Sequence, residues 1–168
     1  MCRRRALRPP PPPGYRPRAV ASVPDRAAAV PYRVEGARVE FLLVRTSDRR
    51  AWTFPKGTPD RSDRGLAGTA LREACEEAGV HGAIDERSLP PYRYPHPSGA
   101  DRVVAPFLLH VLSQHLPHGG ERGREPTWVR PDEARRLLAD GRDELHAAEH
   151  DRVVTEALAR VGERSAGD

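Results

Sequence analysis

The sequence has few cysteines, few aromatic residues and no apolar stretch near its start. Its two cysteines, Cys2 and Cys75, fall in a proline-rich segment and in an expected helix. We therefore expect no structural disulfide and a reducing, cytoplasmic setting. Prolines follow the N-terminal charges in place of an apolar run, so neither a signal peptide nor a transmembrane span is expected. Hydrophobic residues make up 38% of the chain and charged residues 31%, which indicates a polar globular protein.

Acidic residues are missing from the first eighteen positions, which carry six arginines. The whole chain has 28 basic and 24 acidic residues, so the part after this segment is slightly acidic and nucleic-acid binding is not favoured. Pro9–Pro13 cannot donate backbone hydrogen bonds and does not suit a helix or a central strand. We expect residues 1–25 to be a disordered basic Pro-rich tail, residues 26–163 to form one domain, and residues 164–168 to be a flexible C-terminus.

Apolar patterning predicts strands and helices in alternation. The expected strands cover residues 27–34, 39–45, 52–54, 92–94, 102–112 and 127–130. The expected helices cover residues 64–78, 131–139 and 144–161. The first helix would begin with Ser62 or Asp63 as N-cap and end at Gly79, where a left-handed C-cap is favoured. This order predicts an α/β fold in which helices cover a mixed sheet.

Three glutamates share one face of the first expected helix. Glu73, Glu76 and Glu77 are three and four residues apart, so their carboxylates repel one another unless a cation compensates. Arg72 can pair with Glu76, four residues further on. Mg²⁺ and Mn²⁺ prefer oxygen ligands and keep waters that a substrate phosphate can replace. Taken alone, the triplet fits either a metal site or a solvated charged face.

The residues around this helix resemble the Nudix box, the signature of the Nudix hydrolases. In that pattern a glycine, five residues, a glutamate and seven residues precede Arg-Glu, an aliphatic residue, any residue, Glu-Glu, any residue, glycine and an aliphatic residue. Residues 72–80 match the second half throughout, with Ala74 in the aliphatic place. Residues 52–57 are similar to the usual approach to the box, and a weaker resemblance extends over about residues 27–160. The resemblance implies a Nudix-type α/β/α sandwich.

The first half of the box departs from the pattern. Counted from Gly57, the glutamate place falls on Asp63, and eight residues rather than seven then precede Arg72. Counted back from Arg72, it falls on Arg64. Either the loop has one extra residue and Asp63 substitutes, or this acid is absent. Because the family's glutamate mainly supports the arginine and the metal cluster, a catalytically weak or inactive nucleotide-binding module is the alternative to an enzyme.

The resemblance implies a Mg²⁺- or Mn²⁺-dependent pyrophosphohydrolase. Its substrate would be a nucleoside diphosphate derivative or a related polyphosphate, attacked by water. Carried over residue by residue, the metal ligands would be Glu73, Glu76, Glu77 and the carbonyl of Gly57. Glu73 would also help to deprotonate water, and Arg72 would orient the carboxylates. The metal would neutralise charge on the phosphoryl group and lower the pKa of bound water.

Further candidates lie outside the box. Lys56 is a candidate for contacting phosphate, or else an ordinary surface lysine. Many family members take another acid from a loop before a late strand. Glu125 and Glu121 occupy that loop here, and we select Glu125 as the expected metal ligand.

The substrate class stays open. Residues 72–82 are similar to diphosphoinositol-polyphosphate and diadenosine-polyphosphate hydrolases of the family. In contrast, Pro95 lies fifteen residues after the box, where ADP-ribose-cleaving members carry a proline. Trp52, Tyr92 and Tyr94 are candidates for stacking on a base or for packing in the core. The expected partner is a small nucleotide or polyphosphate rather than a membrane, and a homodimer is left open.

Overall fold

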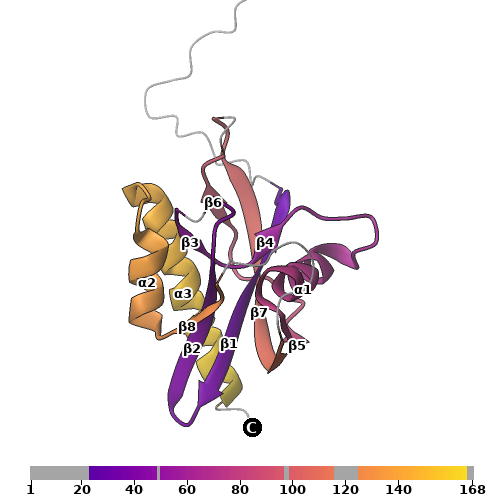
Figure 1. Cartoon of the computed structure of the whole chain (residues 1–168), viewed down its shortest axis with the longest axis vertical. Helices are drawn as coiled ribbons and strands as arrows, with labels where there is room; N and C mark the ends of the chain where they lie inside the picture. Colours follow the sequence, from indigo (N-terminus) through magenta and orange to yellow (C-terminus); the bar gives the residue numbers. More distant parts are fainter. Residues whose placement is uncertain (1–22, 49, 97–98, 116–124, 166–168) are drawn as a thin grey trace, which may run out of the picture.

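A computed structural model describes residues 23–48, 50–96, 99–115 and 125–165. In these residues, eight strands form one mixed sheet with helices on both faces (Figure 1). The strands are β1 (Arg26–Glu35), β2 (Arg38–Arg45), β3 (Trp52–Thr53), β4 (Lys56–Gly57), β5 (Val80–Ile84), β6 (Tyr92–Tyr94), β7 (Arg102–Gln114) and β8 (Thr127–Val129). The helices are α1 (Gly65–Ala78), α2 (Pro131–Ala139) and α3 (Glu144–Ser165). The predicted α/β/α sandwich with a mixed sheet is confirmed.

The sheet has a parallel pair at its centre. Its main path runs β3-β2-β1-β7-β5, while β4, β6 and β8 pair with β1, β7 and β2 respectively. β1 and β7 run parallel from Arg26 opposite Val104 to Tyr32 opposite His110, and the other pairs are antiparallel. No helix among the described residues has the length and apolar character needed to cross a membrane.

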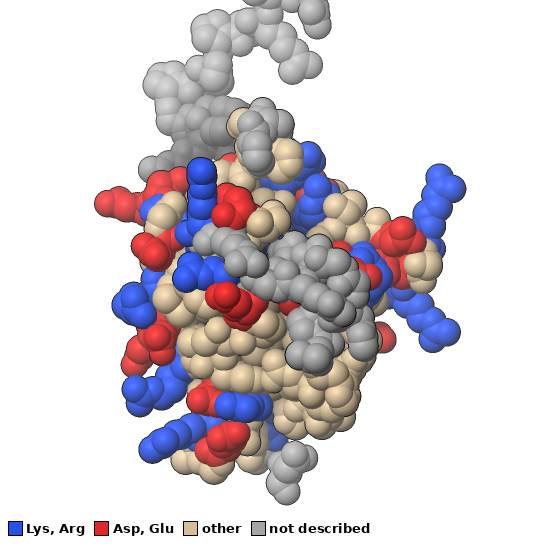
Figure 2. Space-filling model, in the orientation of Figure 1, with Lys and Arg blue, Asp and Glu red and all other residues tan. Residues whose placement is uncertain are grey.

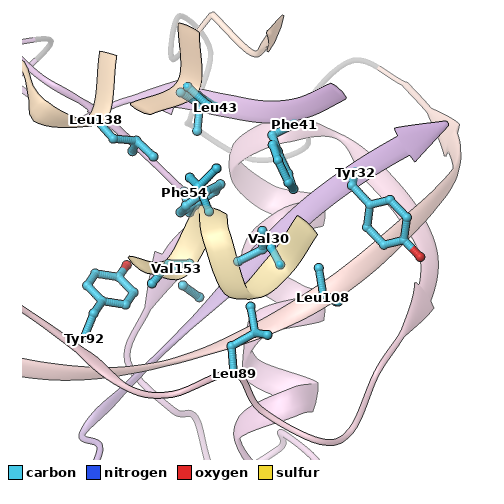
Figure 3. Close-up of a cluster of buried hydrophobic side chains, with 14 of the residues drawn as sticks. Val30, Tyr32, Phe41, Leu43, Phe54, Leu89, Tyr92, Leu108, Leu138 and Val153 are labelled. Carbon is cyan, nitrogen blue, oxygen red and sulfur yellow. The ribbon is translucent and has the colours of Figure 1, made fainter. Parts of the chain in front are cut away.

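Side chains of β1 alternate between the two faces of the sheet. Ala27 and Ala29 join the buried cluster beneath α1, whereas Ala28, Val30 and Tyr32 join the cluster beneath α2 and α3. This two-residue period is the one that a strand buried on both faces requires. Figure 3 shows the second cluster, which is filled mainly by leucine, valine and aromatic side chains.

The layer beneath α1 is built from smaller residues. Ala70, Ala74 and Ala78 of the helix are fully buried, and they face a cluster that includes Ala27 and Ala29 of β1. Small side chains let the helix backbone lie close to the sheet. The helix ends at Gly79, as predicted, in the left-handed conformation (φ 66°, ψ 24°).

The predicted N-cap of α1 is wrong. Arg64 occupies the cap position without a side-chain hydrogen bond, and Gly65 follows with φ 68°. Asp63 does not cap the helix because its carboxylate accepts hydrogen bonds from Arg72 and Thr69 instead. The side chain of Ser62 donates to Asp60 in the preceding loop. Asp63, which the local pattern predicted as the cap, therefore forms an ion pair with Arg72 instead.

Several element boundaries differ from the prediction. β4 and β5 were not expected, because a two-residue strand and a glycine-containing segment after a C-cap both resemble loops. Asp25, placed in the predicted tail, is held by Arg102 (3.0 Å) and by the backbone of Val103. α3 continues to Ser165, into the segment expected to be flexible. The rest of the predicted tail, residues 1–22, lies outside the described residues.

Gly82 is expected to be a stability-critical position in β5. A Cβ at this residue would overlap the backbone carbonyl oxygen of His110 in β7, at the bulge between the two strands. Backbone cannot move aside as easily as a side chain, so Gly82→Ala should lower the free energy of unfolding by roughly 1–3 kcal/mol. Gly162→Ala is the matched control, because nothing lies within 4 Å of a Cβ there and alanine favours a helix. Urea denaturation of both variants measures the difference; equal stabilities would contradict the prediction.

Candidate functional site

The acidic face of α1 meets β4. Glu73 and Glu77 are 9% and 4% exposed, while the side chain of Glu76 is 45% exposed. The Oε2 atom of Glu77 accepts a hydrogen bond from the backbone N–H of Lys56 at 3.2 Å. Gly57 lies against the Glu73 carboxylate so closely that a Cβ on it would overlap that side chain. The helix and β4 thus bring the predicted residues of the two parts of the box together.

Arg72 ties the helix to the loop before it. Its Nη1 lies 2.9 Å from Glu73 Oε1 and 2.9 Å from Glu76 Oε2. Its Nε donates to Asp63 Oδ1 at 3.0 Å, and its Nη2 donates to the carbonyl of Thr58 at 3.0 Å. A planar guanidinium suits this task because it offers five N–H groups in fixed directions. Arg72 thus contacts two of the three glutamates, Glu73 and Glu76.

Asp63, in the loop before α1, holds the side chain of Arg72. Its two oxygens accept from Nε and Nη2 of Arg72 at 3.0 and 3.2 Å, and Oδ2 also accepts from the hydroxyl of Thr69 at 2.8 Å. The hydrogen bonds from Arg72 lower the pKa of Asp63 from 3.8 to about 2. The same contact raises the pKa of Arg72. The structure thus favours the alternative in which the loop has one extra residue and Asp63 substitutes.

The donor chemistry of this face fits a hard divalent cation. Arg72 supplies one positive charge to the three carboxylates that it contacts, those of Asp63, Glu73 and Glu76. The remaining negative charge and the oxygen-only donor set are what Mg²⁺ and Mn²⁺ prefer. Among the described residues, no three His, Cys, Asp or Glu side chains already converge on one point.

Glu125 lies in the loop immediately before β8. It is exposed, has φ 50°, and its carbonyl oxygen accepts from the hydroxyl of Thr127 at 3.0 Å. Glu121, the other candidate, lies outside the described residues.

Two pockets border the acidic face. The first, called here the Arg142 pocket, has a volume of about 560 Å³, and its lining includes Thr46, Lys56, Glu77, Tyr94, Arg142 and His150. The second, called the Arg72 pocket, has a volume of about 640 Å³ and is lined by Thr58, Pro59, Asp60, Ser62, Arg72, Glu73 and Glu76. Figure 2 shows charged side chains of both signs on the loop that precedes α1, at the right edge of the view. The acidic face thus borders two hollows that a substrate can enter.

The aromatic candidates have different surroundings. Tyr92 is buried, and its ring centroid lies 4.7 Å from that of His150, so it cannot stack on a base. The guanidinium of Arg45 covers Trp52 at 4.1 Å. The Tyr94 ring lines the Arg142 pocket, with Lys56 Nζ 5.0 Å from its centroid. Arg142 and His150 were not predicted as site residues, because 86 and 94 positions separate them from Lys56.

Known proteins resemble the chain in sequence. The family model of the NUDIX domain matches residues 23–152. Nudix hydrolase 4 of Arabidopsis thaliana is 33% identical over 119 residues, which cover 64% of this chain and 56% of that relative. The chain thus spans about half the length of this curated relative.

Solved structures resemble it in fold. A C. elegans Ap4A hydrolase has a TM-score of 0.64 at 25% identity, covering 81% of this chain and 96% of that chain. The NUDIX domain of Shewanella oneidensis NrtR, complexed with ADP ribose, has a TM-score of 0.58 at 17% identity, covering 88% and 94%. At that identity the second likeness concerns the fold alone. Since the family model covers well over half of the residues, the chain belongs to the NUDIX domain family.

Proposed function

We propose that the chain is a Mg²⁺- or Mn²⁺-dependent pyrophosphohydrolase acting on a nucleoside diphosphate derivative or a related polyphosphate. The observation that carries this proposal is the acidic face of α1, held by Arg72 and Asp63 against Gly57 and Lys56. The names of two relatives support it, since the plant protein is a Nudix hydrolase and the C. elegans protein an Ap4A hydrolase.

Each residue of the site has a proposed role. Glu73, Glu76, Glu77 and the carbonyl of Gly57 would hold the cation, with Glu125 as the proposed additional ligand. When bound, the cation neutralises charge on the phosphoryl oxygens and lowers the pKa of water.

The remaining proposed roles are to position the carboxylates, to accept a proton and to contact the phosphate. Arg72 fixes the Glu73 and Glu76 carboxylates through its two 2.9 Å contacts. Glu73 accepts the proton of the attacking water at a carboxylate oxygen. Lys56, whose side chain borders the Arg142 pocket, contacts a phosphate oxygen.

A substrate panel tests the proposal. The purified chain is incubated with Mg²⁺ and ADP-ribose, diadenosine tetraphosphate, nucleoside triphosphates or a diphosphoinositol polyphosphate, and the phosphorylated products are separated and quantified. We expect turnover of at least one compound, its loss on addition of a chelator, and its return with excess Mg²⁺. Ligand binding without turnover of any compound would instead favour the alternative, a nucleotide-binding module without catalysis.

Gly57→Ala is expected to impair catalysis while leaving the fold intact. The added Cβ would overlap the Glu73 carboxylate, which is the far end of a flexible side chain and can move more easily than backbone. Misplacing a reacting or ligating group by about 1 Å can cost roughly 100-fold in rate, so we expect a loss of at least about tenfold in kcat/KM. Steady-state kinetics and thermal unfolding, with Gly162→Ala as control, separate the two effects. An unchanged kcat/KM would show that catalysis does not depend on the present position of the Glu73 carboxylate.

A further inference from the structure

Thr69 is a fully buried polar side chain of α1 that has no role in the proposed reaction. It lies three residues before Arg72, so the two side chains share a face of the helix. Its hydroxyl has two acceptors within reach, Asp63 Oδ2 at 2.8 Å and the carbonyl of Gly65 at 3.3 Å. A hydroxyl has one hydrogen, and the shorter contact to a charged acceptor is the stronger one. Thr69 therefore donates to Asp63.

The Asp63 carboxylate lies outside the helix that it serves. Arg64 occupies the cap position of α1 and Gly65 has φ 68°, so Asp63 belongs to the preceding loop. Its contacts within that loop are both to the backbone of Asp60, which is exposed. On α1, Thr69 and Arg72 donate to the carboxylate. Thr69 is thus a fixed point on the helix from which the acid is held.

The contact with Thr69 sets the orientation of this carboxylate. Oδ2 accepts from the hydroxyl of Thr69 and from the backbone N–H of Asp60, both at 2.8 Å. With Oδ2 held from two sides, the carboxyl group has little freedom to rotate. Oδ1 and Oδ2 then lie 3.0 and 3.2 Å from Nε and Nη2 of Arg72. Such paired contacts between a guanidinium and a carboxylate depend strongly on orientation.

The orientation of Asp63 carries over to the glutamates through Arg72. The guanidinium is planar and rigid, so a carboxylate that fixes Nε and Nη2 also fixes Nη1. Nη1 lies 2.9 Å from Glu73 Oε1 and 2.9 Å from Glu76 Oε2. The hydroxyl of Thr69 is therefore linked to both carboxylates by two intermediate side chains, although Thr69 itself has no exposed surface.

We propose that Thr69 is a positioning residue for the cleavage reaction. Its hydroxyl orients the Asp63 carboxylate, and Asp63 in turn orients Arg72. Arg72 then holds Glu73 and Glu76 where the cation binds. This assignment rests on the proposed function, because it takes the two glutamates as metal ligands. It attributes part of the metal affinity of the acidic face to a buried hydroxyl behind it.

Thr69→Val tests the hydroxyl while it keeps the branched shape of the side chain. Losing a direct partner of a metal ligand typically costs 10–100-fold in metal affinity or activity, and Thr69 acts from further away. We therefore expect Mn²⁺ affinity, measured by electron paramagnetic resonance, to fall by about three- to tenfold. At saturating Mg²⁺ the loss should appear in kcat, with KM changed by less than about twofold, because Thr69 does not reach the substrate.

Two further variants control for packing. Thr69→Ser keeps the hydroxyl and loses only a methyl group, so it should retain the metal affinity within about twofold. Thr155→Val removes a threonine hydroxyl from α3, where it contacts Arg135 at an exposed position, and should have no effect. Thermal unfolding of each variant confirms that the assays are made on folded protein. A loss in Thr69→Ser as large as in Thr69→Val would overturn the proposal.

A double-mutant cycle tests whether Thr69 acts through Asp63. In the Asp63→Ala background the hydroxyl can turn to the carbonyl of Gly65, so it is not left without an acceptor. Thr69→Val should then change Mn²⁺ affinity by less than about twofold. A role in packing alone would cost the same factor in both backgrounds, because independent effects add. Equal losses in the two backgrounds would therefore contradict the positioning role.

Metal binding separates this proposal from the proposed function. If no compound is turned over, but Thr69→Val weakens Mn²⁺ binding and Thr69→Ser does not, the positioning role stands and the proposed enzyme fails. If a compound is turned over and Thr69→Val matches the unmodified chain in kcat and in Mn²⁺ affinity, the positioning role is overturned and the enzyme stands. Absence of Mn²⁺ binding by the unmodified chain would overturn both.

Discussion

Glu77→Gln is expected to reduce kcat/KM by at least about a hundredfold. Glu77 is 4% exposed and faces the backbone N–H of Lys56, and glutamine can still accept that hydrogen bond. The substitution therefore removes a negative charge with little change in packing. Losing a residue that only supports a metal ligand typically costs 10–100-fold in metal affinity or activity, and the loss of a ligand should exceed about a hundredfold.

Two measurements decide this prediction. Steady-state kinetics at saturating Mg²⁺ give kcat/KM, and a Mn²⁺ titration followed by electron paramagnetic resonance gives metal affinity. Glu156→Gln, the same change at an exposed position of α3, should match the unmodified chain in both. If Glu77→Gln retains full rate and full metal affinity, Glu77 is not a ligand.

Asp63→Asn is expected to lower both activity and stability. The side chain of Asp63 is 6% exposed, and asparagine cannot accept two hydrogen bonds from Arg72 through two carboxylate oxygens. Arg72 would then hold Glu73 and Glu76 less firmly, so kcat/KM should fall by about tenfold or more. The folded pKa of about 2, against 3.8, corresponds to roughly 2 kcal/mol of unfolding free energy at neutral pH.

The stability that Asp63 contributes should decrease as the pH falls. Because folding lowers the pKa of Asp63, its contribution is complete above about pH 4 and is lost as the pH falls toward about 2. The stability gap between Asp63→Asn and the unmodified chain should therefore shrink over that range. Urea denaturation at pH 7, 4 and 2 measures it, with the fully exposed Asp132→Asn as control. A gap that stays constant with pH would contradict an ionic role for Asp63.

Local patterns predicted the central strands and α1 well, since apolar spacing and the Gly79 cap act over short distances. β5 escaped prediction because Val80–Ile84 contains Gly82, which is there for its close approach to His110 rather than for strand propensity. The N-cap was assigned wrongly because Asp63 has a partner nine positions away in Arg72. Prediction failed where contacts across the fold outweighed local preference.

In the candidate site, too, residues related by local spacing were predicted, and residues brought together by packing were not. The three glutamates lie on one helix, so their spacing alone predicted a common face, and the same spacing predicted that Arg72 could pair with Glu76. Arg142 and His150 reach the site only through the packing of α2 and α3 on the sheet, and one sequence carries no signal for that proximity. The carbonyl of Thr58, which accepts a hydrogen bond from Arg72, could not be predicted either, because every residue type has a backbone oxygen.

Because of the alanines beneath α1, the two faces of the sheet should differ in how many substitutions they tolerate. Ala70, Ala74 and Ala78 set the separation between the helix and the sheet, and that separation also sets how far the glutamates reach toward Gly57. A larger side chain at Ala74 would lift the carboxylates away from β4 as well as strain the core. The face beneath α2 and α3 contains bulky residues such as Phe54 and Leu138, and it can exchange volume among them without moving the acidic face (Figure 3). Sequence drift in relatives should therefore concentrate on that side, while the interface beneath α1 keeps its small residues.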